Sequence, residues 1–169
     1  GWGQNIEMMK MLGDNFSDRF RITILDFPGF GLSEEPSESW TIKDFADMLD
    51  EFVKELGIKK PIIMGHSFGG RVAIRYSADH VVEKIVLFGS PCVREERELP
   101  LSVKILKGIK KLPGMDKIGE FAKNFIGSRD YKAASPIMRQ TLVDVVNEDL
   151  SKYAKEIDCP ILLIWGEND

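Results

Sequence analysis

The chain has 169 residues, of which 43% are hydrophobic, and both values are typical of one globular domain. Its 23 basic and 27 acidic residues give a formal net charge of −4. This balance excludes a strongly basic nucleic-acid-binding surface and gives no support for binding to an anionic membrane. No apolar run approaches the roughly 18 residues that a membrane-spanning helix needs.

The two cysteines, Cys92 and Cys159, are too few for a disulfide framework. Neither belongs to a CxxC pair of the kind that binds zinc, so we expect no metal site. The composition therefore predicts two reduced thiols in a cytoplasmic protein.

The two ends of the chain interrupt recognisable patterns. The sequence begins at Gly1 rather than at a methionine, shows no secretory pattern before its first helix, and ends at Asp169 directly after an apolar run. We interpret the 169 residues as an excerpt of a longer chain that is truncated at both ends.

The first forty residues predict a helix, a strand and a turn. Residues 5–12 carry apolar side chains at helical spacing, and Gly13 is expected to end this helix. The β-branched run RITIL at 21–25 predicts a strand. The turn-rich stretch DFPGFGLS follows, and we expect Asp26 and Ser33 to hold it through local hydrogen bonds.

Helices and strands then alternate. Apolar residues recur every three or four positions over 41–56, which predicts a helix that Gly57 ends. A second helix is expected over 68–78. Short apolar runs predict three further strands, at 61–64, 84–88 and 160–165. This alternation indicates an α/β fold with a mostly parallel sheet flanked by helices.

One long stretch shows no strand pattern. It predicts three helices, at 102–111, 115–126 and 136–146. We therefore divide the chain into a first part of the core, a helical insertion and a continuation of the core, at residues 1–93, 94–153 and 154–169. Apolar side chains in the insertion are expected either to pack against the core or to line a modest hydrophobic pocket: Ile105, Leu106, Ile109, Phe121, Phe125 and Met138.

The segment GHSFGG fits the pattern G-x-S-x-G and lies between a predicted strand and a predicted helix. In a sharp turn of this kind the residues two before and two after the serine approach each other closely, so both must be small. Gly65 and Gly69 meet this requirement. The turn presents the Ser67 hydroxyl at the carboxyl edge of the sheet and at the amino end of a helix, where developing negative charge is stabilised. The pattern predicts a nucleophilic serine; the alternative is a tight turn that merely packs a helix on a strand.

Four motifs in the same order resemble the α/β-hydrolase family. GHSFGG resembles its nucleophile elbow, and DFPGFGLS resembles its D-x-P-G-x-G-x-S turn. GWGQN at the start resembles the tail of an H-G-W-G oxyanion loop, and WGEND at the end resembles a G-x-x-D acid turn. The resemblance runs through the whole chain except the helical insertion, which would be the variable cap.

The resemblance implies a role for particular residues. Ser67 would be the nucleophile, and Asp169 the acid that orients a histidine. The backbone N–H groups of Phe68 and Trp2 would form the oxyanion hole, although Trp2 could instead be a packed core aromatic. Glu167 is an alternative acid, but it does not occupy the fourth position of G-x-x-D.

The general base is missing from the expected triad. The chain has two histidines. The side chain of His66 points away from that of its neighbour Ser67, and His80 is expected to cap a helix or to face solvent. The family's histidine follows the acid, so the excerpt is expected to be inactive; the alternative is a natural relative without a base. In the sheet of this family, the strand that leads into the H-G-W-G loop lies between the strands predicted here at 21–25 and 61–64. That strand is absent from the 169 residues, so we expect them to fold poorly on their own.

The resemblance implies a serine hydrolase that acts on a small ester or a similar acyl substrate without a cofactor or metal. A serine at the elbow argues against the haloalkane dehalogenase and epoxide hydrolase branches, which use aspartate there. A carbon–carbon bond hydrolase and an aminopeptidase of the same fold are alternatives. A non-catalytic protein that binds a small hydrophobic ligand is the alternative from another class.

Overall fold

The computed structural model describes residues 1–92 and 129–167. The chain separates into two compact units, one formed by Gly1–Arg94 with Pro136–Asp169 and the other by Glu95–Ser135. The described part of the second unit contains the short helix α6 (Arg129–Ala133). The helices predicted at 102–111 and 115–126 lie outside the described residues. Residues 136–153, which the sequence pattern assigned to the insertion, group with the first unit.

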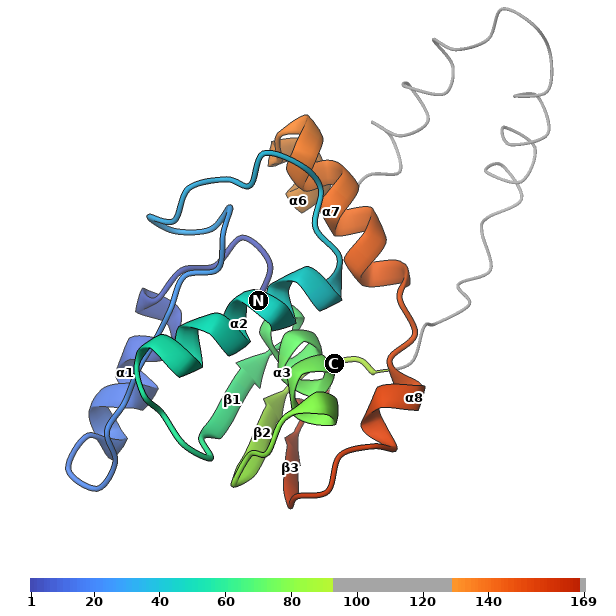
Figure 1. Cartoon of the computed structure of the whole chain (residues 1–169). Coiled ribbons are helices and arrows are strands. Elements are labelled where there is room, and N and C mark those ends of the chain that lie inside the picture. Colours follow the sequence, from blue (N-terminus) through green and yellow to red (C-terminus); the bar gives the residue numbers. More distant parts are fainter. Residues whose placement is uncertain (93–128, 168–169) are drawn as a thin grey trace, which may run out of the picture. The chain divides into compact units, whose positions relative to one another are not determined.

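The first unit is built on a parallel sheet. Its strands are β1 (Ile62–His66), β2 (Lys84–Phe88) and β3 (Ile161–Ile164), in the order β1-β2-β3 (Figure 1). Both strand pairings are parallel and join strands formed by the predicted apolar runs, so the expected parallel α/β arrangement is confirmed. In the register, Gly65 lies opposite Leu87 and His66 opposite Phe88, which brings the carboxyl ends of β1 and β2 to the same edge.

Helix α2 (Ile42–Glu55) begins and ends where the sequence predicts. Thr41 and Asp44 form a capping box, in which the Thr41 N–H donates to the Asp44 carboxylate at 2.7 Å. Gly57 follows with a φ of 62°, a backbone conformation that glycine adopts without strain. The helix buries an apolar stripe formed by Ile42, Phe45, Ala46, Leu49 and Val53.

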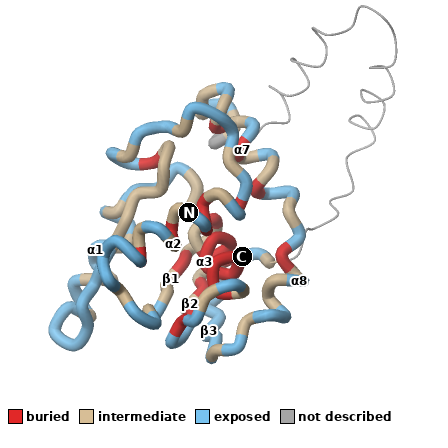
Figure 2. Tube along the Cα trace, in the orientation of Figure 1, coloured by how far each residue is buried: buried red, intermediate tan, exposed pale blue. Residues whose placement is uncertain are grey.

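Helix α3 (Phe68–Asp79) is at the centre of the core. It contacts α2, β1, β2 and the short helix α8 (Ser151–Ala154), and buried residues gather along it and the adjoining strands (Figure 2). Its buried residues include two arginines, Arg71 and Arg75. Because a buried guanidinium needs polar partners, each of these two side chains requires hydrogen-bond acceptors nearby.

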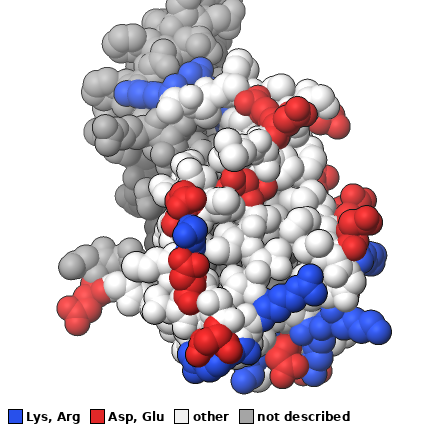
Figure 3. All heavy atoms as spheres, turned by 90° about the vertical axis from the view of Figure 1, so that its left-hand side faces the viewer, with Lys and Arg blue, Asp and Glu red and all other residues white. Residues whose placement is uncertain are grey.

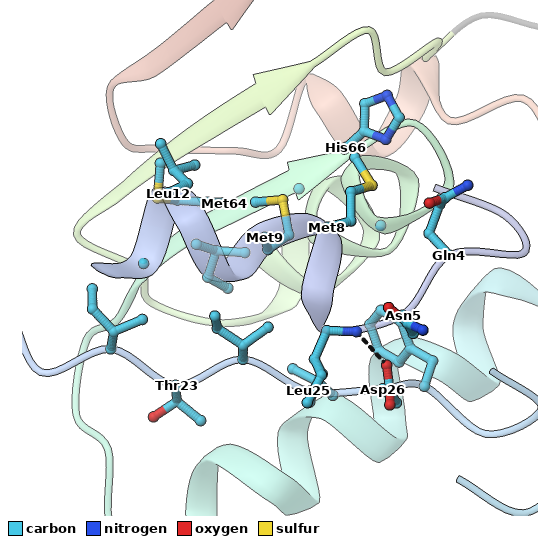
Figure 4. A pocket seen from close by; sticks show the side chains of 18 of the residues that line it. Gln4, Asn5, Met8, Met9, Leu12, Thr23, Leu25, Asp26, Met64 and His66 are labelled. Carbon is cyan, nitrogen blue, oxygen red and sulfur yellow. Dashed lines mark hydrogen bonds between the residues drawn. The ribbon is translucent and has the colours of Figure 1, made fainter. Parts of the chain in front are cut away.

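The strand predicted at 21–25 is absent, since residues 21–27 have no regular secondary structure. A β-branched run becomes a strand only where another strand accepts its backbone hydrogen bonds. Among the described strands β1 pairs with β2 alone, so no ladder reaches residues 21–27. A groove of about 240 Å³ separates this segment from β1 and is bordered by α1 (Glu7–Phe16) (Figure 4).

Gly13 does not end the first helix, contrary to the sequence prediction, because α1 continues to Phe16. A Cβ atom at Gly13 would lie 3.0 Å from the Ile24 side chain and 3.1 Å from that of Ile22. The glycine therefore allows the helix to approach residues 22–24 closely. Glycine at position 13 is therefore explained by packing and not by helix termination.

The surface carries both signs of charge. Acidic and basic side chains are interspersed over the face shown in Figure 3, in agreement with the nearly balanced composition. Within 1–92 and 129–167, none of the helices has the length and apolar character needed to span a bilayer.

His80 joins α3 to α2. It is the C-cap residue of α3, and its Nδ1 lies 2.9 Å from the Tyr76 carbonyl oxygen, so the predicted capping role is confirmed. Its ring stacks on Tyr76, and its Nε2 lies 3.1 Å from a carboxylate oxygen of Asp50. Asp50 also accepts a hydrogen bond of 2.5 Å from Lys54. These contacts, the one with Lys54 first, lower the pKa of Asp50.

This cluster predicts a pH-dependent contribution to stability. Because the folded-state pKa of Asp50 is lowered, its contribution is present above the unfolded pKa of about 3.9 and is lost as the pH falls through the folded value. We expect Asp50→Asn to reduce the free energy of unfolding at pH 7 by about 1 kcal/mol and to have a smaller effect at pH 2. Urea unfolding at both pH values measures this difference.

The matched control is Asp47→Asn, which removes the exposed pair with Lys43 on the same helix. Since exposed pairs contribute little, its effect should stay below about 0.5 kcal/mol. Equal losses from the two variants at pH 7 would contradict the assignment.

Candidate active site

Ser67 lies on a sharp turn between β1 and α3. It is the N-cap residue of α3, with φ 49° and ψ −112°. A positive φ is unusual for any residue with a side chain and marks local strain. The strained strand-to-helix turn predicted from GHSFGG is therefore present. Ser67 is half-buried.

The close approach within the turn extends one residue beyond the predicted pair, since a Cβ atom at Gly65 would lie 2.7 Å from the carbonyl carbon of Gly69 and closer still to Gly70. A Cβ atom at Gly65 would lie 2.6 Å from the Cα of Gly70, whereas one at Gly69 would have no atom within 4 Å. A Cβ atom at Gly70 would lie 1.9 Å from the Ser90 hydroxyl oxygen. The expectation that Gly69 must be small is wrong, because the backbone crossing occurs one residue later. The second glycine at the end of GHSFGG, which is Gly70, was the feature of the sequence that could have indicated this contact.

Hydrogen bonds hold the turn against the end of β2. The Ser67 N–H donates to the Phe88 carbonyl oxygen at 2.9 Å. The Ser67 carbonyl oxygen accepts from the N–H groups of Gly70 and Arg71, at 3.1 and 3.2 Å. The buried Ser90 hydroxyl lies 2.9 Å from the Phe88 carbonyl oxygen and 3.3 Å from that of Gly65. The sequence reasoning missed Ser90, because only the three-dimensional contact with the turn shows its role.

An aromatic cluster surrounds the residue after Ser67. The Phe68 ring is buried and lies 4.9 Å from the Phe45 ring and 5.4 Å from those of Phe30 and Trp2, between ring centroids. Trp2 also packs edge-on against Phe30 at 4.9 Å. The structure thus brings together the two residues whose N–H groups were predicted to form an oxyanion hole. The half-buried Trp2 ring also packs against Phe30 and Phe68, as the alternative role in packing would require.

The Gly1–Trp2 segment lies directly beside the turn. A Cβ atom at Gly1 would lie 2.9 Å from the His66 ring and 3.6 Å from the Ser67 Cβ atom. On the other side of Ser67, α3 presents its first N–H groups, which have no acceptor within the helix.

The turn at residues 26–33 has the structural role that was predicted. Asp26 accepts hydrogen bonds from the N–H groups of Ile6 at 2.8 Å (Figure 4) and Leu32 at 3.2 Å. The Ser33 hydroxyl donates to the Asp26 carbonyl oxygen at 2.8 Å. Gly31 has a φ of 56°, and a Cβ atom there would overlap the Asp26 carboxylate. This network fixes the loop next to α1 and explains both polar residues without a chemical role.

The two histidines occupy different regions. His66 borders the groove, where its ring lies near Met8 and Gln4 (Figure 4). His80 is held by Tyr76 and Asp50 at the other end of α3, about 18 Å along the helix from Ser67. Asp169 lies outside the described residues. Within the described part of the chain, no three His, Cys, Asp or Glu side chains are grouped so that they could hold a metal ion.

The contact between Gly70 and Ser90 can be tested by substitution. Gly70→Ala places a methyl group against Ser90, and we expect it to lower the free energy of unfolding by about 1–3 kcal/mol. Gly69→Ala is the matched control, since its methyl group meets open space and should change stability by less than about 1 kcal/mol. Chemical unfolding compares the two variants.

Ser90→Gly alone should also lower stability, because it removes the hydroxyl that bonds to the Gly65 and Phe88 carbonyl oxygens. Adding Gly70→Ala to it should cost little more, since the clashing atoms are gone, so the two changes are strongly non-additive. Simple addition of the two single effects would show that the clash does not determine the glycine.

Comparison with known proteins agrees with this geometry. Residues 1–108 match the family model for the alpha/beta hydrolase fold. A pimeloyl-[acyl-carrier protein] methyl ester esterase of Proteus mirabilis is 27% identical over 193 residues, which cover 100% of this chain and 72% of the relative. A 2-hydroxy-6-oxononadienedioate/2-hydroxy-6-oxononatrienedioate hydrolase of Klebsiella pneumoniae is 26% identical over 196 residues, which cover 100% of this chain and 66% of that relative.

Among solved structures, an esterase from Exiguobacterium antarcticum superposes with a TM-score of 0.68 at 19% sequence identity. The match covers 96% of this chain and 69% of the esterase. The family model covers well over half of the sequence and includes the turn at Ser67, and the solved structure shares the fold. The chain therefore belongs to the alpha/beta hydrolase fold family.

Proposed function

We propose that the protein is a serine hydrolase that cleaves a small carboxylic ester or a similar acyl substrate. The observation that carries this proposal is the backbone of Ser67, held at φ 49° between β1 and the first turn of α3. This conformation directs a half-buried hydroxyl to the edge of the sheet where α/β folds bind ligands. A structural turn would gain nothing from the strain that it carries.

The reaction follows from the groups around that hydroxyl. The Ser67 oxygen attacks the substrate carbonyl carbon, and the carbonyl oxygen becomes negatively charged. The N–H groups of Phe68 and Trp2 donate to this oxygen, and the loss of one such donor typically raises the barrier by about 2.7–4 kcal/mol. Collapse of the intermediate releases the alcohol and leaves an acyl group on Ser67, which water then removes.

Proton transfer requires a base that accepts the Ser67 proton and returns it to the leaving group. We assign this role, in the whole protein, to a histidine that follows the acid in the chain, with Asp169 orienting it. Neither histidine of this chain suits the role, because His66 borders the groove and His80 is bound to Asp50 at the far end of α3.

The relatives support an acyl or a closely related substrate. One is named as a methyl ester esterase, and one solved structure is an esterase. The Klebsiella relative is named as a hydrolase of a 2-hydroxy-6-oxo dienedioate, and it favours a carbon–carbon bond hydrolase as the second candidate. Both chemistries can use the same nucleophile and the same oxyanion donors.

The test compares Ser67→Ala with the wild type in the full-length protein. We expect turnover of p-nitrophenyl acetate to fall at least about a thousandfold and labelling by a fluorophosphonate probe to disappear. Ser77→Ala is the matched control, because Ser77 is a buried serine elsewhere on α3 and should leave both readouts unchanged.

Three outcomes separate the candidates. Equal turnover by Ser67→Ala and the wild type would reject the nucleophile and favour a ligand-binding protein. Serine-dependent cleavage of a vinylogous diketone that is faster than that of the ester would favour the carbon–carbon hydrolase. Serine-dependent ester cleavage that is faster supports the esterase.

A further inference from the structure

Arg71 connects the helix behind Ser67 to two distant loops. The residue lies in the first turns of α3 and is only 4% exposed. Its Nη1 donates to the Pro91 carbonyl oxygen at 2.8 Å, and its Nη2 donates to the Glu148 carbonyl oxygen. Pro91 follows β2, and Glu148 follows α7 (Pro136–Asn147), so one side chain joins three segments that are far apart in the sequence.

The first of these loops is the one that holds the turn at Ser67. Phe88 accepts the Ser67 N–H, and Ser90 contacts Gly70 and the Gly65 carbonyl oxygen. Arg71 itself donates its backbone N–H to the Ser67 carbonyl oxygen at 3.2 Å. The residue is therefore bonded to Ser67 through its main chain and, through its side chain, to the loop that supports Ser67 from the other side.

The second loop completes the arrangement. The Leu150 N–H donates to the Cys92 carbonyl oxygen at 3.0 Å, which links the segment after α7 to the segment after β2. Leu150 is fully buried. We call the set Arg71, Pro91, Cys92, Glu148 and Leu150 the Arg71 brace. Its hydrogen bonds connect α3, the segment after β2 and the segment after α7 to one another.

Arginine suits this position for physical reasons. Its planar fork of N–H groups can donate to two carbonyl oxygens at fixed angles, whereas the single ammonium of lysine cannot reproduce both directions. Burial lowers the pKa of the Arg71 guanidinium, and the nearby carboxylate of Glu148 opposes this shift. Hydrogen bonds from a charged donor are stronger than those between neutral groups, so the guanidinium holds the Pro91 and Glu148 carbonyl groups firmly in place.

We propose that Arg71 is a positioning residue for Ser67: its buried guanidinium presses the loop after β2 against the turn and keeps Ser67 in its strained conformation. The inference rests on the proposed serine hydrolase function. Strained backbone persists only where the surrounding structure over-determines it. Without the brace, the loop at 88–92 can move away, and the hydroxyl loses its alignment with the oxyanion donors.

The matched control is Arg75, which lies one turn further along α3 and is 6% exposed. It pairs with Asp79 at 2.6 Å and lies over the Tyr153 ring at 4.2 Å. Replacing either arginine removes a buried charge from the same helix. Only Arg71 bonds to the loop that supports Ser67, so a comparison of the two separates positioning from general stability.

The experiment measures p-nitrophenyl acetate turnover and fluorophosphonate labelling rates for Arg71→Met, Arg71→Lys and Arg75→Met in the full-length protein. Rates are expressed per folded molecule after active-site titration with the probe. We expect Arg71→Met to lower kcat and the labelling rate by the same factor, about tenfold to a hundredfold, with little change in KM. Arg71→Lys should recover part of this loss, and Arg75→Met should lower Tm while kcat stays unchanged.

The proposal is overturned if Arg71→Met lowers Tm as Arg75→Met does but keeps the wild-type kcat and labelling rate. If Arg71→Met does not fold, Arg71→Lys decides, and a wild-type kcat in that variant overturns the proposal equally. Failure of the proposed function is a separate result, because Ser67→Ala would then retain wild-type turnover.

Discussion

The hydrogen bond from the Ser67 N–H to the Phe88 carbonyl oxygen is the interaction on which the site depends. It extends the pairing of two parallel strands by one residue into a turn whose backbone is strained. A residue held in such a conformation costs of the order of 1–3 kcal/mol, which the surroundings must offset. The crossing of Gly65 over Gly70 and the buried Ser90 hydroxyl supply that support.

The aromatic cluster connects this turn to the rest of the first unit. Phe68 lies at its centre and contacts rings from the N-terminal segment, from the turn after residue 26 and from α2. Edge-to-face contacts between aromatic rings contribute about 0.5–1.5 kcal/mol each beyond the burial of their surface. The positions of the proposed oxyanion donors are thus tied to the hydrophobic core through the packed side chains of Phe68 and Trp2.

The two edges of the sheet differ from its centre. Next to β1 lies the groove that residues 21–27 border, and the residues of β3 are exposed within the described part of the chain, Leu163 by 59%. The centre is well packed, since α3 buries nine of its residues against the strands, α2 and α8. The turn at Ser67 follows the edge strand β1 and is anchored to the packed centre by its hydrogen bond to Phe88 of β2 and by helix α3.

Local patterns in the sequence predicted the features that depend on neighbouring residues: the helix over 41–56, the parallel apolar strands and the bend at Ser67. The tertiary structure decided the rest, because it depends on contacts between distant segments. RITIL has strand propensity, but none of the described strands pairs with it. Gly13 is required by its close contact with Ile24, and Gly70 by its contact with the hydroxyl of Ser90, twenty residues later. The spacing of residues along the chain is enough to predict helices, strands and turns, because these depend on residues close in sequence. Contacts between distant segments are determined only when the segments pack together in the tertiary structure.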